Sequence, residues 1–84
     1  MLAVLQSMRE FKFDPPLVLK GKVVVRTLDD AADFVRRYKD ARRPVMQDGL
    51  LRKLERADAD DEQRIAADAF RAWAEVEGLL VKAA

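Results

Sequence analysis

The chain has 84 residues, which fits one domain and lies near the lower limit at which a chain buries a hydrophobic core without help. Half of the residues are hydrophobic and 37% are charged, a balance typical of folded rather than disordered proteins. The lack of cysteine excludes disulfides and thiolate chemistry, and the lack of histidine removes the commonest metal ligand and the commonest general base at neutral pH.

Membrane and secretion signals are weak in this sequence. No apolar run approaches the roughly 20 residues that a transmembrane helix requires. The segment from Met1 to Met8 is rich in apolar side chains, but it has neither a basic leader nor a small-residue cleavage site. We therefore expect a cytoplasmic protein that does not bind a membrane.

The N-terminal residues 1–13 are interpreted as an arm or a short helix that precedes a single domain of residues 14–84. The apolar residues at the start of this segment are spaced for one helical face, whereas Phe11 and Phe13 alternate as in a short strand. Ordinary packing is the simple interpretation. The alternative is an arm that docks on a partner or is exchanged with one, because a small core gains most from an apolar segment that a partner contributes.

Two runs that favour β structure, Leu17 to Lys20 and Lys22 to Thr27, flank Gly21. The second run contains three consecutive valines, whose branched side chains suit a pleated surface better than a helix. The pattern predicts a β-hairpin. Leu79 to Lys82, near the end of the chain, is a candidate third strand of the same sheet.

The first helix is predicted to begin after Thr27 and to stop before Pro44. The Thr27 hydroxyl is placed to accept a backbone N–H of the first turn, and two aspartates follow at the favourable end of the helix dipole. Proline inside a helix costs about 3 kcal/mol, which sets the end. The apolar face would consist of Leu28, Ala31, Ala32, Phe34, Val35 and Tyr38.

The second helix is predicted to start at Pro44, because proline suits a first helical turn. Gly49 weakens this helix by roughly 1 kcal/mol relative to alanine, so we expect close backbone packing there, a bend, or a later start. A short polar link from Ala57 to Asp60 would follow. The expected apolar face consists of Val45, Met46, Leu50, Leu51 and Leu54.

The last helix has the clearest periodic pattern and the only tryptophan of the chain. It should begin near Asp60, where three acidic residues lie at the positive end of the dipole, and end at Gly78 in a left-handed conformation. Leu79 should then fold back on the last turn. The predicted buried stripe consists of Ile65, Ala66, Ala69, Phe70, Trp73 and Val76.

The order of these parts resembles the small bacterial proteins grouped as domain-of-unknown-function family 982. The resemblance is carried by the hairpin, by the segment from Thr27 to Val35 that leads into an alanine-rich helix, and by the closing segment from Ala69 to Leu79. These are packing and capping residues. The resemblance implies a compact α+β domain and carries over no catalytic residue.

Catalytic and metal chemistry find little support in the sequence. The acidic link from Asp58 to Glu62 begins like a calcium-binding EF-hand loop, but the required glycine and glutamate are replaced by Gln63 and Ala69. The hydroxyl groups of Ser7 and Thr27 have no histidine base to activate them. We therefore expect no enzyme activity, no metal, no cofactor and no small-molecule ligand.

Charge is unevenly distributed along the second half of the chain. Between Arg36 and Arg56 there are eight basic and three acidic residues, a balance of +5, and between Ala57 and Glu77 there are seven acidic and two basic residues, a balance of −5. Solvated complementary faces on adjacent helices explain this pattern most simply. The best candidate for a partner-binding site is the basic cluster of Arg36, Arg37, Lys39, Arg42 and Arg43.

We therefore predict a small α+β domain in which a hairpin packs against about three helices. The expected function is a non-catalytic protein-interaction or regulatory module that associates with a second copy or with a protein partner, guided by its oppositely charged patches. The alternative is a nucleic-acid-binding protein that uses the segment from Arg36 to Arg43, since arginine side chains match phosphate geometry.

Overall fold

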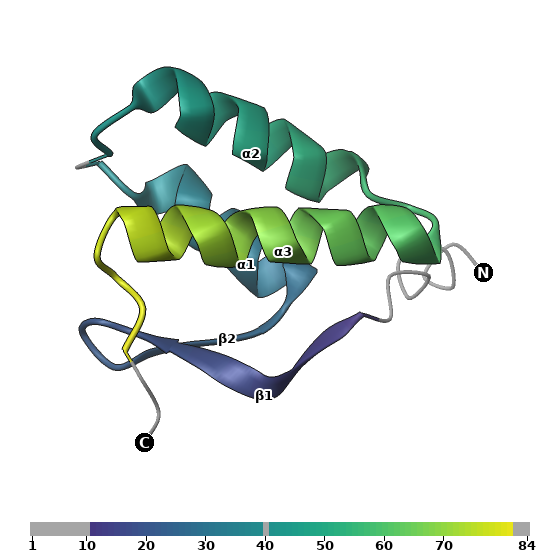
Figure 1. Cartoon of the computed structure of the whole chain (residues 1–84), viewed down its shortest axis with the longest axis horizontal. Helices are drawn as coiled ribbons and strands as arrows, with labels where there is room; N and C mark the ends of the chain where they lie inside the picture. Colours follow the sequence, from purple (N-terminus) through teal and green to yellow (C-terminus); the bar gives the residue numbers. More distant parts are fainter. Residues whose placement is uncertain (1–10, 40, 82–84) are drawn as a thin grey trace.

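The computed structural model describes residues 11–39 and 41–81 and confirms the predicted α+β class. Three helices cover a two-stranded antiparallel hairpin in this described part. In Figure 1, helix α3 crosses the middle of the molecule, with α1 behind it, α2 above it and the hairpin below. The elements in chain order are β1 (Lys12–Leu19), β2 (Val23–Thr27), α1 (Leu28–Arg37), α2 (Pro44–Arg56) and α3 (Asp60–Val76).

The hairpin forms as predicted, although its first strand is longer than expected. β1 begins at Lys12, so it includes Phe13 and the two prolines that follow, whereas Phe11 lies just before it. Lys12 pairs with Thr27 and Leu17 pairs with Val25, and the register shifts between these two pairs. The prolines lie in this irregular stretch, where a missing N–H removes no regular ladder bond. The first ten residues of the predicted arm lie outside the described residues.

The segment after α3 pairs with β1 over a very short distance. Leu80 forms a single antiparallel bridge with Leu19, flanked by hydrogen bonds from Lys20 N–H to the Leu79 carbonyl and from Val81 N–H to the Val18 carbonyl, both 2.9 Å. The described part of the predicted third strand is thus one bridge rather than a strand. The bridge ties the end of α3 to the hairpin.

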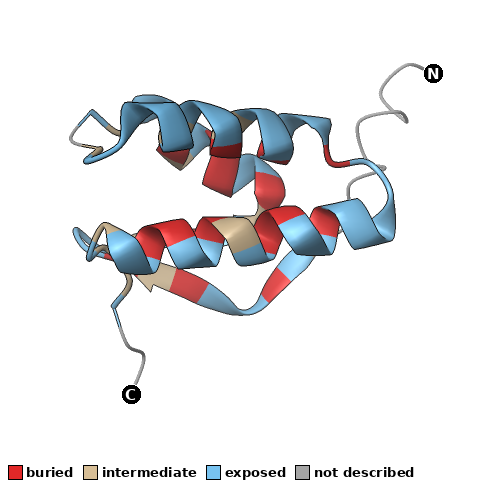
Figure 2. Cartoon of the chain, turned by 45° about the horizontal axis from the view of Figure 1, so that its top comes forward, coloured by how far each residue is buried: buried red, intermediate tan, exposed pale blue. Residues whose placement is uncertain are grey.

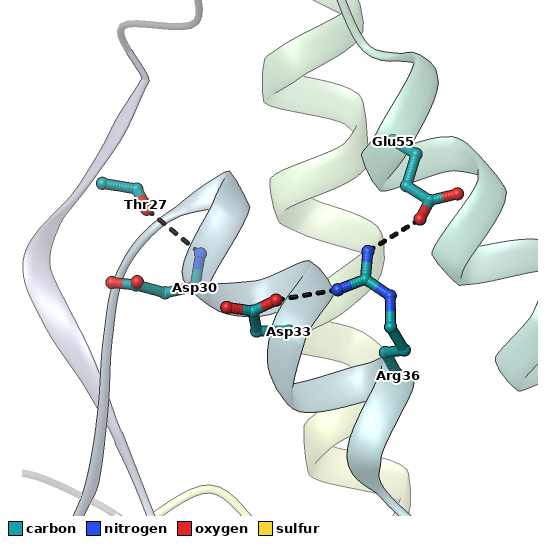
Figure 3. Close-up of polar contacts among 5 residues, drawn as sticks. All are labelled: Thr27, Asp30, Asp33, Arg36 and Glu55. Atoms are coloured by element: carbon teal, nitrogen blue, oxygen red, sulfur yellow. Dashed lines mark hydrogen bonds and ion pairs between the residues drawn. The ribbon is translucent and has the colours of Figure 1, made fainter. Parts of the chain in front are cut away.

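Helix α1 begins at the predicted cap. The Asp30 backbone N–H donates to the Thr27 hydroxyl over 3.1 Å (Figure 3), and the Asp30 carboxylate in turn accepts from the Arg26 backbone N–H over 3.0 Å. The helix ends at Arg37, before Pro44, as expected. Gln47 of α2 joins the two helices, because its side-chain amide donates to the Val35 and Tyr38 carbonyls, each over 2.7 Å.

Helix α2 begins at Pro44 and continues through Gly49 to Arg56. Of the three alternatives expected at Gly49, a later start is wrong because α2 begins at Pro44. Close packing is also wrong, since a Cβ atom there would meet no atom of the described residues within 4 Å beyond its own turn of the helix. The predicted face is also partly wrong: Leu50 and Leu54 are buried, but Val45 is 83% exposed and Met46 is 49% exposed. In Figure 2 the buried positions of α2 lie on the side facing the rest of the molecule, and its outer side is exposed.

Helix α3 ends as its sequence predicts. Gly78 has a φ of +72°, and its N–H donates to the Glu75 carbonyl over 3.0 Å. Leu79 N–H then donates to the Ala74 carbonyl over 2.8 Å. These two bonds form a Schellman motif, which satisfies carbonyls that have no partner within the helix.

The core is centred on Phe70 and Trp73 of α3, as predicted. Phe70 is fully buried and Trp73 is 5% exposed, with ring centroids 5.9 Å apart. The Trp73 ring also contacts the rings of Phe34 and Tyr38 edge-on, at 6.2 Å and 5.4 Å. An aromatic cluster therefore joins α1 to α3 in the core.

The edges of the predicted α3 stripe are wrong. Ile65 is 57% exposed and Val76 is 59% exposed. At about 100° per residue these two side chains share one line of the helix, about a third of a turn away from Phe70, and therefore lie outside the covered face. The buried positions of α3 are instead Gln63, Ala66, Ala67, Phe70, Trp73 and Ala74.

Candidate functional site

The predicted basic residues do not share one set of contacts in the structure. Arg36 lies between α1 and α2, where its guanidinium contacts the Asp33 carboxylate at 2.7 Å and the Glu55 carboxylate at 2.8 Å (Figure 3). The hydrogen bond that Arg36 donates to Glu55 is the main cause that raises the pKa of Arg36 above its ordinary value. Its charge is therefore largely matched by two carboxylates of the same chain.

The other predicted site residues lie in different surroundings. Arg37 and Lys39 line a shallow hollow between β2 and α1, together with the carboxylates of Asp30 and Asp33. Arg42 lies in the connection before α2, where its backbone N–H donates to the Glu77 carboxylate over 3.0 Å. Arg43 lines a groove between α2 and α3.

This α2–α3 groove is lined largely by apolar residues. It has a volume of about 450 Å³. Its lining from α2 is Arg43, Met46, Gly49, Leu50 and Lys53, and its lining from α3 is Ala69, Ala72, Trp73, Val76 and Glu77. Small residues form much of its floor, so the two helix backbones are accessible to an approaching group.

A smaller hollow continues the α2–α3 groove toward the start of α3. It measures about 180 Å³, shares Lys53 with the larger one, and is lined further by Arg56, Ala57, Glu62 and Ile65. The two hollows together follow most of the length of both helices.

Large apolar side chains remain exposed along this surface. Met46 and Val76 line the α2–α3 groove, Ile65 lines its continuation, and Val45 lies beside Met46 in the first turn of α2. All four are between 49% and 83% exposed. Single exposed apolar residues are common on protein surfaces, but several of them along one groove are typical of a binding surface, and Met46, Val76 and Ile65 meet this description.

The two rims of the groove carry opposite charge. The α2 rim has Arg43 and Lys53, with Arg56 along the continuation, whereas the α3 rim has Glu77 at one end and Glu62 at the other. The Glu62 carboxylate accepts the Ala59 and Asp58 backbone N–H groups over 3.0 Å and 3.1 Å. These bonds, the one from Ala59 first, lower the pKa of Glu62, so it carries a full negative charge at neutral pH.

Gln63 is a buried polar residue near the start of α3, at one end of this surface. Its side chain is 2% exposed, accepts the Phe11 backbone N–H over 3.1 Å, and donates to the Asp58 carbonyl over 2.7 Å. One buried amide thus joins the start of β1, the link before α3 and the first turn of α3. Sequence reasoning did not single out Gln63, because only its position on the buried line of α3 distinguishes it from a surface glutamine.

Acidic side chains are frequent in the described part of the chain, but they are not gathered into a metal site. No group of three or more Asp and Glu side chains there is arranged to hold a metal ion. None of the helices there is long and apolar enough to cross a membrane. Comparison with protein-family models, curated proteins and solved structures gave no match, so the resemblance to domain-of-unknown-function family 982 stays a prediction.

Proposed function

We propose that the protein is a non-catalytic interaction module whose binding surface is the α2–α3 groove. The observation that carries this proposal is the largely apolar lining of the groove and its continuation, in which Met46, Val76 and Ile65 are exposed. Covering apolar surface contributes roughly 25 cal/mol per Å². A partner that covers these side chains therefore gains free energy without any rearrangement of the described fold.

The shape of the groove suits an α-helical partner. Two helices with small residues between them form a channel into which an amphipathic helix places side chains at i, i+3 and i+4 spacing. Gly49 on α2, with Ala69 and Ala72 on α3, supplies those small residues. We also propose that the protein is cytoplasmic, as its sequence leads us to expect, and bacterial, as the family resemblance implies.

The nucleic-acid alternative receives less support from the geometry. Arg36 is held by two carboxylates, and Arg37 and Lys39 share their hollow with Asp30 and Asp33. A phosphate backbone approaching these cations would meet carboxylates at the same distance. A mobility shift of DNA or RNA at low salt, abolished by changing Arg42 and Arg43 to glutamine, would reinstate this alternative.

The groove is tested by comparing Met46→Glu with Arg52→Gln. Both variants lower the net charge by one on exposed positions of α2, but only Met46 lines the groove. We expect Met46→Glu to weaken both self-association of the purified chain and recovery of any partner from the source cells, and Arg52→Gln to weaken neither. The proposal is refuted if the two variants behave alike in both assays while keeping wild-type circular dichroism.

A further inference from the structure

The charges around the α2–α3 groove identify a specific occupant, and this inference rests on the function proposed above. Helices α2 and α3 run antiparallel, because Arg43 and Glu77 line one end of the surface while Arg56 and Glu62 line the other. The basic rim therefore follows α2 along its whole length, and each end of the α3 rim is acidic. We propose that a second copy of this chain occupies the groove, with α2 of each copy lying on α3 of the other.

Charge complementarity selects this arrangement over the other symmetric one. Two copies can meet face to face about a two-fold axis that runs either along the groove or across it. An axis along the groove brings Arg43 of one copy to Glu77 of the second and Arg56 to Glu62, so every rim contact is attractive. An axis across the groove brings Arg43 to Arg56 and Glu62 to Glu77, so like charges meet.

Neither Arg43 nor Glu77 is explained by the dipole of its own helix. Arg43 is the residue that caps the N-terminus of α2, and Glu77 caps the C-terminus of α3. A helix N-terminus favours negative charge and a C-terminus favours positive charge, so each of these side chains has the unfavourable sign for its own helix. Within the chain, the Glu77 carboxylate accepts the Arg42 backbone N–H over 3.0 Å beside the N-terminus of α2, which compensates for its charge. An attractive contact across the interface would therefore compensate mainly for Arg43.

Gly49 fits the same interface. Glycine in this helix costs about 1 kcal/mol relative to alanine. Among residues 11–39 and 41–81, no neighbour outside its own helical turn requires its small size, since a Cβ there would meet none of their atoms within 4 Å. Together with Ala69 and Ala72 it leaves room for a helix of the second copy to approach closely. The space that the monomer leaves open is thus where the second copy would pack.

The test is a charge exchange, Arg43→Glu and Glu77→Lys, measured by sedimentation equilibrium of the full chain up to about 1 mM. Each change gives its own helix end the favourable sign. Because Glu77→Lys also removes the acceptor of the Arg42 backbone N–H, both variants are first compared with wild type by circular dichroism and thermal unfolding. We expect the wild type to dimerise and each variant alone to dissociate about tenfold more readily at low salt. An equimolar mixture of the two variants should restore association to within about threefold of wild type, because both rim contacts then pair opposite charges.

Other outcomes would overturn the proposal in distinct ways. Single variants that associate more tightly than wild type would indicate the axis across the groove. A wild type that stays monomeric, with a cellular partner lost in Met46→Glu, would leave the groove as a binding surface but refute a second copy as its occupant. Association that the N-terminal variant Leu5→Glu abolishes and the charge exchange leaves unchanged would show that the N-terminal segment makes the contact instead.

Discussion

Replacing Gly49 with alanine should raise the stability of the folded chain and weaken its self-association. These two effects have opposite sign because they arise at different places. The fold gains from a residue that favours the helical conformation, whereas a second copy would meet an additional methyl group on the floor of the α2–α3 groove. Most substitutions at an interface cannot separate folding from binding in this way.

The expected gain in folding stability follows from the open space around Gly49. A Cβ at Gly49 meets no atom within 4 Å, so the change introduces neither a clash nor a new packing contact. Only the intrinsic preference remains, which favours alanine over glycine by about 1 kcal/mol in a helix interior. For a domain of this size, about 1 kcal/mol raises the melting temperature by roughly 4–8 °C.

The measurement is thermal unfolding at a concentration below that of dimer formation, followed by sedimentation at high concentration. Gly78→Ala is the matched control, because it is the same substitution at a φ of +72°, where a side chain is strained. We expect Gly78→Ala to lower the melting temperature. A Gly49→Ala variant that is less stable would refute the open groove, and one that associates as tightly as wild type would refute close approach at this position.

The remaining predictions concern the core, a helix cap and two surface charges. Trp73→Ala should destabilise the fold by about 3–5 kcal/mol in urea unfolding, since the ring is 5% exposed and packs on three other rings. Thr27→Ala should lower the free energy of unfolding by about 1 kcal/mol, because it removes the cap of α1, whereas Thr27→Ser keeps a hydroxyl acceptor and should retain most of that stability. The pKa of Glu62 lies below its ordinary value of 4.5 in the folded chain. The stability that its carboxylate contributes is therefore present above pH 4.5 and is lost as the pH falls through the lower folded pKa. NMR titration of the carboxylate, and unfolding of Glu62→Gln as a function of pH, would measure this loss. Arg36→Ala should change the melting temperature only slightly, and high salt should remove the difference, because its ion pairs are about half exposed.

Helix limits were predictable where a few local residues decide them. Thr27, Pro44 and Gly78 each impose one backbone requirement, and the structure places a helix cap, a helix start and a left-handed residue at those positions. The start of β1 was not predictable in the same way. Proline normally argues against a strand, and only the irregular pairing between Lys12 and Leu17 allows two of them within β1.

The distribution of the basic cluster also depended on distant residues. Arg36, Arg37 and Arg43 are close in sequence, yet Glu55 holds the first, the hollow beside β2 contains the second, and the α2–α3 groove contains the third. The break between Arg37 and Pro44 separates α1 from α2 and turns these side chains toward different neighbours. Because these arginines are close in the chain, the sequence predicted a single site. The fold instead gives each of them different neighbours.

The errors in the predicted helix faces point to the same surface as the proposed function. Periodicity reveals which side of a helix avoids water, but it does not reveal whether the chain itself or another molecule provides the cover. Val45, Met46, Ile65 and Val76 were assigned to the core by spacing, and all four are exposed along the α2–α3 groove or beside it. If a second copy covers them, the apolar pattern of α2 and α3 describes the core of the dimer, and spacing alone could not have separated that core from the core of one chain.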